Sequence, residues 1–286
     1  MFTNVKYKLF TFVNQKKAMD YLQLATQYLE PKLKGRYIHL DTILPILESL
    51  NSDFEITEIG KSVQEREIYQ VKTGTGKTKI LMWSQMHGNE STTTKGLFDF
   101  FNFLQSDNEI ANRIKNEYTL LCIPMLNPDG AFLYTRENAN TIDLNRDAFN
   151  ATQPEMQVLH SVCKSFQPDY RYNLHDQRTI FGTEGFNLPA TMSFLAPAFN
   201  NDRDYNEVRM KAIVIINKMN RALQEYIPYQ IGRFDDSYNV NCTGDYFTTQ
   251  NTPTILFEAG HFQMDYGRDE SRKYVFISLL SSLLDN

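Results

Sequence analysis

Short apolar runs alternate with longer stretches of helical periodicity along most of this chain, and this alternation restricts the fold more than any other feature. The apolar runs suit strands buried on both faces and cover residues 79–85, 118–124, 169–175 and 254–257. The stretches between them have apolar side chains at helical spacing and cover residues 91–104, 154–166, 205–226 and 268–284. This order is typical of an α/β domain in which helices flank a central twisted sheet of mixed, mostly parallel strands.

Residues 1–52 differ from the rest and predict an N-terminal helical segment that packs on the same domain. Between residues 17 and 50, apolar side chains recur at helical spacing in two stretches, with Pro31 and Gly35 between them. Residues 54–72 then alternate in the manner of strands, with a polar break at Gly60. Because 286 residues with 42% hydrophobic content can bury one large core, we expect a single domain over residues 1–286.

Charge and hydrophobicity argue against several classes of partner. A formal net charge of -5 provides no basic field for nucleic acid. The longest apolar stretches, such as residues 275–284, fall far short of the roughly 20 residues that span a membrane. Residues 1–17 mix lysine and asparagine with apolar side chains and show no export-signal pattern, so we expect a cytoplasmic protein.

The cysteines do not indicate a site. Cys122, Cys163 and Cys242 lack the spacing of metal ligands, and the first two fit core positions. An odd number of cysteines without an export signal also gives no disulfide framework. The sequence leaves the oligomeric state open.

Side chains suited to metal chemistry gather where predicted strands end. His87, His175 and Glu258 each end or directly follow an apolar run. In α/β sheets, ligand-binding residues collect beyond the carboxyl ends of the strands. Glu90 comes three residues after His87, which places both side chains on one side of a turn, and Gly88 suits a sharp change of direction between them. Two imidazoles and one carboxylate can hold a metal ion. The spacing of His87 and Glu90 alone is weak evidence for a metal site.

Four short motifs make the comparison with a known family specific. They are His-Gly-Asn-Glu at 87–90, Asn-Pro-Asp-Gly at 127–130, Ile-Asp-Leu-Asn-Arg-Asp at 142–147 and Phe-Glu-Ala-Gly at 257–260. In this order, with Arg136 ahead of the third motif and His175 at a strand end, they resemble the zinc carboxypeptidase family from about Phe54 to the C-terminus. The resemblance implies the family's fold and a metallocarboxypeptidase that hydrolyses the C-terminal amide bond of a peptide.

The resemblance also implies a metal site and its chemistry. His87, Glu90 and His175 correspond to the ligands of one Zn²⁺ per chain, the ligand set of carboxypeptidase A itself. Glu258 corresponds to the base that activates the zinc's water, and Arg136 to the group that polarises the scissile carbonyl. Asp143 corresponds to the carboxylate that receives the other ring N–H of the first histidine, a common support for a ligating imidazole.

Substrate recognition follows from the same correspondence. Asn145 and Arg146 match the pair that binds the free C-terminal carboxylate of a peptide or small amide, since a guanidinium can form two parallel hydrogen bonds to it. Tyr238 is the predicted mobile tyrosine that closes over the substrate, with Tyr246 as the alternative. Arg178, Arg233 and Asp245 are open candidates for the pocket that selects the C-terminal side chain.

Other interpretations remain beside this one. Aspartoacylase and succinylglutamate desuccinylase enzymes share the His-Gly-Asn-Glu motif and cleave acyl groups from amino acids, although the Asn-Pro-Asp-Gly motif and the nine-residue step from Arg136 to Asn145 favour the peptidase. A binding protein that has lost catalysis is a third hypothesis, but it would not need Glu258. His261, three residues after Glu258, is a weaker metal-ligand candidate.

Residues 72–79, Lys-Thr-Gly-Thr-Gly-Lys-Thr-Lys, resemble a phosphate-binding loop but do not fit one. The first glycine of that motif would fall at Val71, and the segment precedes a strand and does not lead from a strand into a helix. We therefore expect it to form a hairpin turn.

Overall fold

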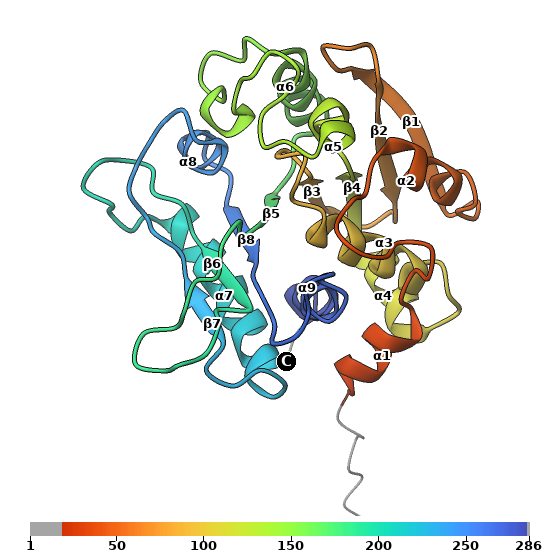
Figure 1. The fold of residues 1–286 in the computed structure, drawn as a ribbon, viewed down its shortest axis with the longest axis vertical. Coiled ribbons are helices and arrows are strands. Elements are labelled where there is room, and N and C mark those ends of the chain that lie inside the picture. Colours follow the sequence, from red (N-terminus) through yellow and green to blue (C-terminus); the bar gives the residue numbers. More distant parts are fainter. Residues whose placement is uncertain (1–18, 285–286) are drawn as a thin grey trace, which may run out of the picture.

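One sheet organises the structure, a computed structural model that describes residues 19–284 (Figure 1). Its strands are β1 (Phe54–Lys61), β2 (Glu67–Thr73), β3 (Thr78–Ser84), β4 (Tyr118–Ile123), β5 (Tyr170–Asp176), β6 (Met192–Leu195), β7 (Ile231–Arg233) and β8 (Thr254–Ala259). The helices are α1 (Tyr21–Gln27), α2 (Leu40–Leu47), α3 (Thr92–Leu104), α4 (Glu109–Glu117), α5 (Pro128–Leu133), α6 (Pro154–Phe166), α7 (Glu207–Gln224), α8 (Thr243–Thr249) and α9 (Ser271–Ser282), with a 3-10 turn η1 (Leu144–Arg146).

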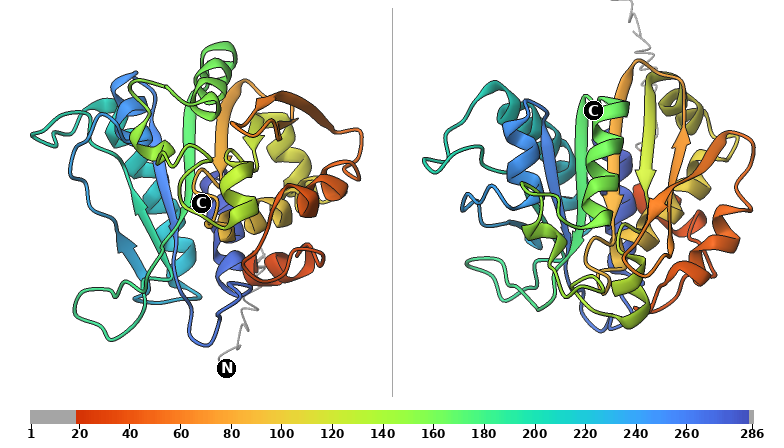
Figure 2. Two further views of the ribbon diagram at one scale, coloured as in Figure 1. Left: turned by 45° about the horizontal axis from the view of Figure 1, so that its top comes forward. Right: turned by 90° about the horizontal axis from the view of Figure 1, so that it is seen from above.

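The strand order is β1-β2-β4-β3-β5-β8-β6-β7. The four central strands β4, β3, β5 and β8 run parallel, whereas β2 and β6 pair antiparallel with the two outer members of that group. Helices cover both faces of this sheet (Figure 2). The predicted class, one α/β domain with a mixed, mostly parallel sheet, is confirmed.

Strand β3 shows why the central runs are apolar throughout. Alternate strand residues point to opposite faces, and Ile80 and Met82 belong to the larger hydrophobic core, which includes side chains of α3, α7 and α9. Leu81 and Trp83 belong to the second core, which contains Met156 and other residues of α6. A strand buried on both faces needs apolar residues at consecutive positions, and this is the pattern of residues 80–83.

The N-terminal helices lie against the same domain. The two predicted helices are α1 and α2, and α1 packs against α3 and α9 while α2 contacts α5. Residues 1–18 of the predicted N-terminal segment lie outside the described residues. No helix in the described part of the chain is long and apolar enough to cross a bilayer.

The prediction of a hairpin turn at residues 72–79 is wrong. Strands β2 and β3 are not neighbours, because β4 lies between them and pairs with both. The segment crosses over the start of β4, where Thr75 N–H donates to Lys115 O and Gly76 N–H to Tyr118 O. A Cβ at Gly76 would lie 1.9 Å from the Glu117 carbonyl carbon. Gly76 therefore allows two segments of the backbone to cross in close contact.

Gly60 does not interrupt the strand, as the sequence had predicted, but changes its register. Strand β1 continues to Lys61, and its register against β2 shifts between Glu58 and Gly60. The glycine marks a bulge within the strand, a common position for a residue without a side chain.

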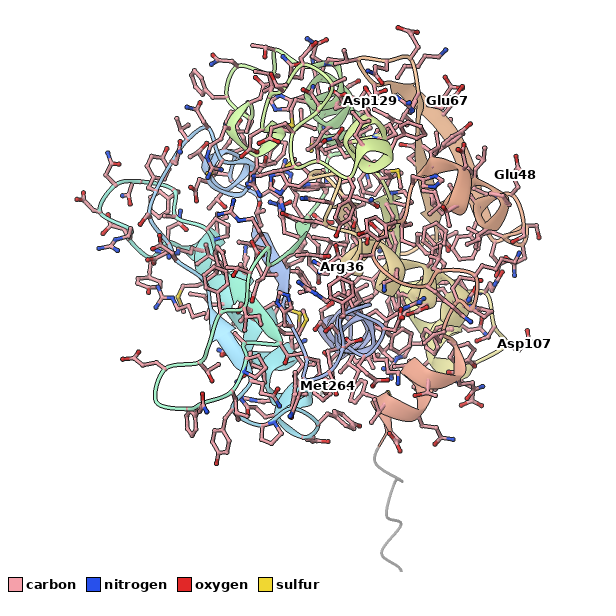
Figure 3. All side chains as sticks on the ribbon, in the orientation of Figure 1. Arg36, Glu48, Glu67, Asp107, Asp129 and Met264 are labelled. Atoms are coloured by element: carbon pink, nitrogen blue, oxygen red, sulfur yellow. The ribbon has the colours of Figure 1, made fainter. Side chains whose placement is uncertain are left out.

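The Asn-Pro-Asp-Gly motif forms a buried junction beneath the sheet's carboxyl edge. Asn127 caps α5 by accepting a hydrogen bond from Gly130 N–H at 2.8 Å. Asp129 lies on α5 (Figure 3). It is fully buried and accepts from Ser62 Oγ at 2.8 Å and from Arg66 Nη1 at 2.6 Å. These contacts fix the turn between β1 and β2 to α5, so the motif connects the edge of the sheet to its centre.

Gly88 fits directly against this junction. Its φ is not positive, so backbone freedom is not the reason for a glycine here. An added Cβ would lie 1.9 Å from the carbonyl carbon of Gly130 and 2.2 Å from Ala131 N. The loop from His87 to Glu90 can approach α5 only because this position has no side chain.

We expect Gly88→Ala to lower the free energy of unfolding by about 1–3 kcal/mol, because two backbone segments must separate to admit the methyl group. Urea denaturation followed by circular dichroism measures this loss. Gly182→Ala is the matched control, since its Cβ would meet only Leu188 O at 3.6 Å. Equal stability of the two variants would show that the Gly88–Gly130 approach is not tight in solution.

Candidate active site

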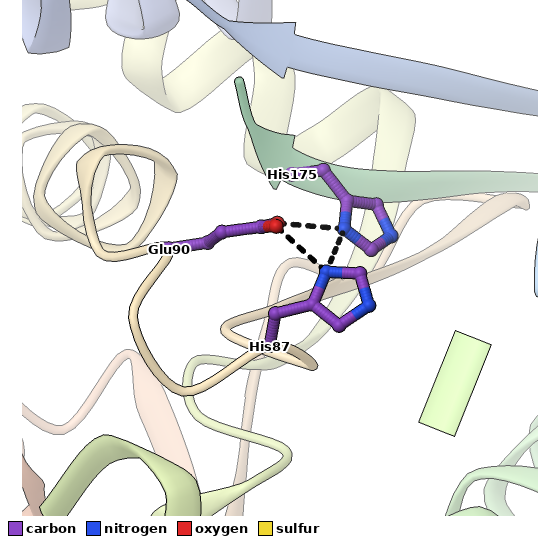
Figure 4. Close-up of side chains that lie close together, drawn as sticks. All are labelled: His87, Glu90 and His175. Carbon is purple, nitrogen blue, oxygen red and sulfur yellow. Dashed lines mark hydrogen bonds and ion pairs between the residues drawn. The ribbon is translucent and has the colours of Figure 1, made fainter. Parts of the chain in front are cut away.

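His87, Glu90 and His175 meet at the carboxyl edge of the sheet, and the atoms that could bind a metal face one another (Figure 4). His87 Nδ1 lies 2.7 Å from Glu90 Oε1, His175 Nδ1 lies 2.8 Å from Glu90 Oε2, and the two Nδ1 atoms are 3.1 Å apart. All three residues are buried. The structure therefore brings together the three residues that the sequence nominated as ligands.

The sheet explains how residues so distant in sequence converge. His87 follows the end of β3, and His175 is the sixth residue of β5, the neighbour of β3. In the parallel pair of β5 and β8, His175 is directly opposite Glu258. Adjacent strands lie about 4.8 Å apart, and paired residues point to the same face. Glu258 is therefore the immediate neighbour of the cluster.

A hydrogen bond to Asp143 orients the imidazole of His87. His87 Nε2 lies 3.0 Å from Asp143 Oδ1, the residue that the sequence proposed for this contact. A proton on Nε2 leaves the lone pair of Nδ1 directed at Glu90 and His175. Arg136 lies at the edge of the same group, with Nε 3.1 Å from Asp143 Oδ2 and Nη1 3.2 Å from Glu90 Oε1.

The three clustered groups perturb one another's pKa. Burial alone would raise the pKa of Glu90, but His87 and His175 hold it well below its usual range. Burial alone would lower the pKa of His87, yet attraction to Glu90 and hydrogen bonds to Asp143 and Glu90 raise it. For His175, burial outweighs the attraction of Glu90, so its pKa is lowered.

Glu258 has the opposite environment from Glu90. Burial, followed by the negative charges of Glu90 and Asp176, raises the pKa of Glu258 well above its usual range, and Arg136 opposes this shift. A carboxyl group in this setting can accept a proton and hold it, which is a requirement for a general base that later acts as an acid.

A cavity of about 680 Å³ opens onto the cluster. Its lining includes every residue that the sequence assigned to the site: His87, Glu90, Arg136, Asp143, Asn145, Arg146, His175, Tyr238 and Glu258. The other charged or polar groups along its wall are Asn173, Asp176, Gln177, Arg178, Asp235, Ser237, Asn239 and Asp245. The predicted residues thus share one solvent-accessible space.

The two predicted carboxylate-binding residues lie where η1 meets α8. Asn145 Oδ1 accepts a hydrogen bond from Thr243 N–H at 2.8 Å, so its NH₂ group is the part of the amide that can donate to a ligand. Arg146 Nη1 lies 2.7 Å from Asn145 O and 3.1 Å from Cys242 Sγ, and its side chain is exposed.

The structure places the remaining candidate residues in different surroundings. Tyr238 is half-buried and lines the cavity, whereas Tyr246 stacks on His160 with ring centroids 5.1 Å apart. His261 lies apart from the three clustered residues, and its Nε2 is 3.1 Å from Arg268 Nη2. Arg233 pairs with Asp236 at 2.6 Å.

Two residues of β5 were missed by the sequence reasoning. Asn173 is buried and lies on the same strand face as His175, two positions away, and among the described residues its Oδ1 has no hydrogen-bond partner. Strand periodicity could have identified it. Asp176 donates its backbone N–H to Glu90 Oε2 at 3.1 Å, and no pattern in the sequence signals that contact.

The clustered donors fit a metal ion. In a tetrahedral zinc site with ligands at about 2.0–2.1 Å, the ligand atoms lie roughly 3.3 Å apart. The Nδ1 atoms of His87 and His175 lie at distances of this order from each other and from one carboxylate oxygen of Glu90 each. The lone pairs of these atoms cannot all be satisfied by hydrogen bonds to one another. Two imidazoles and a carboxylate are also the ligand types of catalytic zinc.

An α/β sheet whose central strands end in such a group, with a buried carboxylate on the next strand, has the architecture of a metallopeptidase. The chain belongs to the zinc carboxypeptidase family, because the model of that family, described as zinc carboxypeptidase, matches residues 43–263. The family resemblance stated from the four motifs is confirmed.

Individual relatives are distant. Carboxypeptidase 2 of Trichophyton rubrum is 25% identical over 100 residues, which are 34% of this chain and 19% of that protein. Cytosolic carboxypeptidase 6 of Mus musculus is 28% identical over 145 residues, 47% of this chain and 26% of the mouse protein. The matched regions thus span only 19% and 26% of these curated relatives.

Solved structures share the fold at low identity. The metallo-carboxypeptidase from Burkholderia cenocepacia superposes with a TM-score of 0.69 at 15% identity, over 84% of this chain and 66% of that one. Carboxypeptidase A from Helicoverpa armigera gives a TM-score of 0.66 at 16% identity, over 91% and 78% of the two chains.

Proposed function

We propose that this protein is a zinc-dependent metallocarboxypeptidase that hydrolyses the C-terminal amide bond of a peptide or small amide. The observation that carries the proposal is the convergence of His87, Glu90 and His175 with Glu258 on the adjacent strand. The family membership supports it, and one Zn²⁺ per chain fits the single three-residue group found in the described residues.

Each residue near the cluster has a role that its position supports. His87, Glu90 and His175 hold the ion, which when bound supplies a Lewis acid and lowers the pKa of water. Glu258 takes a proton from the attacking water and passes it to the leaving amine. Arg136, at the edge of the cluster, donates to the scissile carbonyl oxygen as negative charge develops there.

Substrate recognition uses other residues of the same cavity. Arg146 and the NH₂ group of Asn145 bind the terminal carboxylate, which gives the charge-assisted hydrogen bonds that favour an exopeptidase. Tyr238 lies along the wall and is our candidate for the tyrosine that closes over the bound substrate. Asp143 keeps the Nδ1 lone pair of His87 directed at the ion.

The same cavity favours a basic C-terminal side chain. Asp245 lines it and is only 5% exposed, and the buried Oδ1 of Asn173 is an acceptor without a partner among the described residues. Burial raises the pKa of Asp245 to about 6, so the group is mostly ionised at neutral pH. Asp245 Oδ2 also accepts from Asn239 N–H at 2.9 Å, which holds the carboxylate in place. A buried carboxylate on the same lining as a free acceptor suits the ammonium of lysine or the guanidinium of arginine. Arg178 is exposed, and water weakens its influence on side-chain choice.

The second candidate is a deacylase of N-acyl amino acids, of the aspartoacylase and succinylglutamate desuccinylase type. It would use the same metal group and the same carboxylate-binding pair. A cavity of about 680 Å³ accommodates a peptide as well as an acyl amino acid, so substrate tests separate the two. A screen of blocked dipeptides against N-acyl amino acids, with metal analysis, makes the distinction, and a catalytically inactive binding protein would turn over neither.

A cytoplasmic location is also proposed. All three cysteines are free thiols, and Cys122 and Cys163 are buried. Reduced thiols are typical of cytosolic proteins. One similar protein has a name that places it in the cytosol.

We expect Glu258→Gln to retain its zinc and to lose turnover by a factor of about 10²–10⁴, because the amide keeps the shape but cannot accept the proton. Metal analysis and peptidase rates measure the two properties. His175→Ala should instead lose the metal, and His261→Ala is the control that keeps both metal and activity. Turnover that survives in Glu258→Gln would remove this residue as the base.

We expect Arg146→Ala to lower kcat/KM for peptides with a free C-terminus by about 10–100-fold, because a charge-assisted interaction with the carboxylate is lost. Residual cleavage of the matching peptide amides should change little. Arg178→Ala, which removes another exposed arginine of the cavity, is the control. An equal loss on acids and amides would contradict the exopeptidase assignment.

We expect Asp245→Asn to reduce the ratio of kcat/KM for lysine-ending over leucine-ending peptides by about 10–100-fold. In the unmodified protein this ratio should fall between pH 7.5 and 5, because Asp245 loses its charge as the pH drops through about 6. Leucine-ending peptides correct for effects on the metal site, and Asp235→Asn, an exposed carboxylate of the same cavity, is the control. A ratio independent of pH and of Asp245 would contradict this specificity.

A further inference from the structure

Asp176 is a buried carboxylate that none of the proposed catalytic steps uses. It follows His175 at the end of β5 and is 7% exposed. Because strand residues alternate, Asp176 and His175 point to opposite faces of the sheet. The His175 side chain reaches His87 and Glu90, whereas the Asp176 carboxylate reaches the start of α3.

The carboxylate of Asp176 caps helix α3 from outside the helix. Its Oδ2 accepts from Thr92 N–H at 2.6 Å and its Oδ1 from Thr93 N–H at 3.0 Å. The residue at the normal capping position, Ser91, makes no side-chain bond to its own helix and donates instead to Arg36 O at 2.6 Å. The first amides of a helix lack partners within it, and a carboxylate there is favoured by the helix dipole.

The backbone of Asp176 makes a second connection in the opposite direction. Its N–H donates to Glu90 Oε2 at 3.1 Å, and the same oxygen lies 2.8 Å from His175 Nδ1. Glu90 lies two residues before Thr92, so one residue of β5 holds both the start of α3 and the side chain that precedes it. The loop that carries His87 and Glu90 is thereby attached to the strand that carries His175.

Arg268 extends this attachment to the strand of Glu258. It is 2% exposed, and its positive charge acts on the Asp176 carboxylate. Its Nη1 donates to Ala259 O at 2.9 Å and to Gly260 O at 2.6 Å, and its Nη2 donates to Gln177 O at 2.7 Å. Ala259 and Gly260 are the two residues after Glu258, and Gln177 is the residue after Asp176.

We propose that Asp176 is a positioning residue that sets the distance between Glu90 and His175 and thereby tunes the affinity of the site for its metal. This inference rests on the proposed zinc site. Supporting groups around metal ligands typically change affinity by about 10–100-fold when removed. In Asp176→Asn the amide can accept only one of the two helix N–H groups and presents N–H to the other, so Glu90 and His175 are held less firmly.

The test compares zinc binding in Asp176→Asn and Asp99→Asn. Asp99 is the matched control because it is also buried, accepts from Arg272 and from Glu30 N–H, and does not line the cavity. Zinc affinity is measured by chelator competition, and the rise in melting temperature on adding zinc reports the same affinity separately from the stability of the metal-free protein. Absorption of the Co²⁺-substituted proteins reports ligand geometry.

We expect Asp176→Asn to weaken zinc by about 10–100-fold, to reduce the zinc-dependent rise in melting temperature and to change the Co²⁺ spectrum. Asp99→Asn should be less stable with and without zinc but should keep the affinity and the spectrum. Should the Asn variant not fold, Asp176→Glu, which keeps the charge but displaces both oxygens, is expected to show the same weakening.

Two results would overturn the inference in different ways. If the unmodified protein binds zinc and the Asp176 variants match it in affinity and spectrum, Asp176 serves only folding, and the proposed function is unaffected. If the unmodified protein itself does not bind zinc, the proposed function fails and this inference fails with it.

Discussion

A buried carboxylate between two imidazoles is the constraint around which the rest of this structure is arranged. Glu90 is 5% exposed and lies within 2.8 Å of nitrogen atoms from His87 and His175. Removing such groups from water is costly unless a counter-charge and full hydrogen bonding compensate. The chain provides that compensation around the three residues. Asp143 bonds to the His87 imidazole, Arg136 donates to Glu90 Oε1, and the backbone N–H of Asp176 donates to Glu90 Oε2. The divalent cation that we propose for this site would add positive charge beside Glu90.

The parallel centre of the sheet makes this concentration of charge possible. Strands β3, β5 and β8 all end at the same edge, so His87, His175 and Glu258 meet although they are far apart in the sequence. The apolar faces of the same strands are anchored in two cores, which hold the strand ends in fixed register. The close approach of Gly88 to Gly130 then sets the loop that carries His87 and Glu90 against α5. Packing energy that is spread over the whole domain thus maintains the positions of a few polar atoms.

The sequence could predict the parts of the structure that have a local pattern. Consecutive apolar residues such as 80–83 predict a strand buried on both faces, and the short motifs identify residues whose side chains meet at the strand ends. The order of the strands has no such local signal, which is why the segment at residues 72–79 was expected to form a hairpin although β4 lies between β2 and β3. Asp176 was missed for the same reason, because its partners Thr92 and Thr93 are 84 and 83 residues away. Contacts of that kind exist only after the chain has folded.

The selectivity proposed for a basic C-terminal residue depends on the way in which two parts of the cavity are joined. The amide of Thr243, the first residue of α8, donates to Asn145 Oδ1, and Cys242 Sγ lies 3.1 Å from Arg146. Asp245 is the third residue of the same helix. The proposed carboxylate-binding pair, Asn145 and Arg146, is therefore connected to the helix that carries Asp245, so an arginine and a buried carboxylate lie on linked parts of the same cavity. A ligand that carries a carboxylate and a cationic side chain on the same carbon would match both charges in only one orientation. That orientation would fix where its amide bond lies relative to His87, Glu90 and His175.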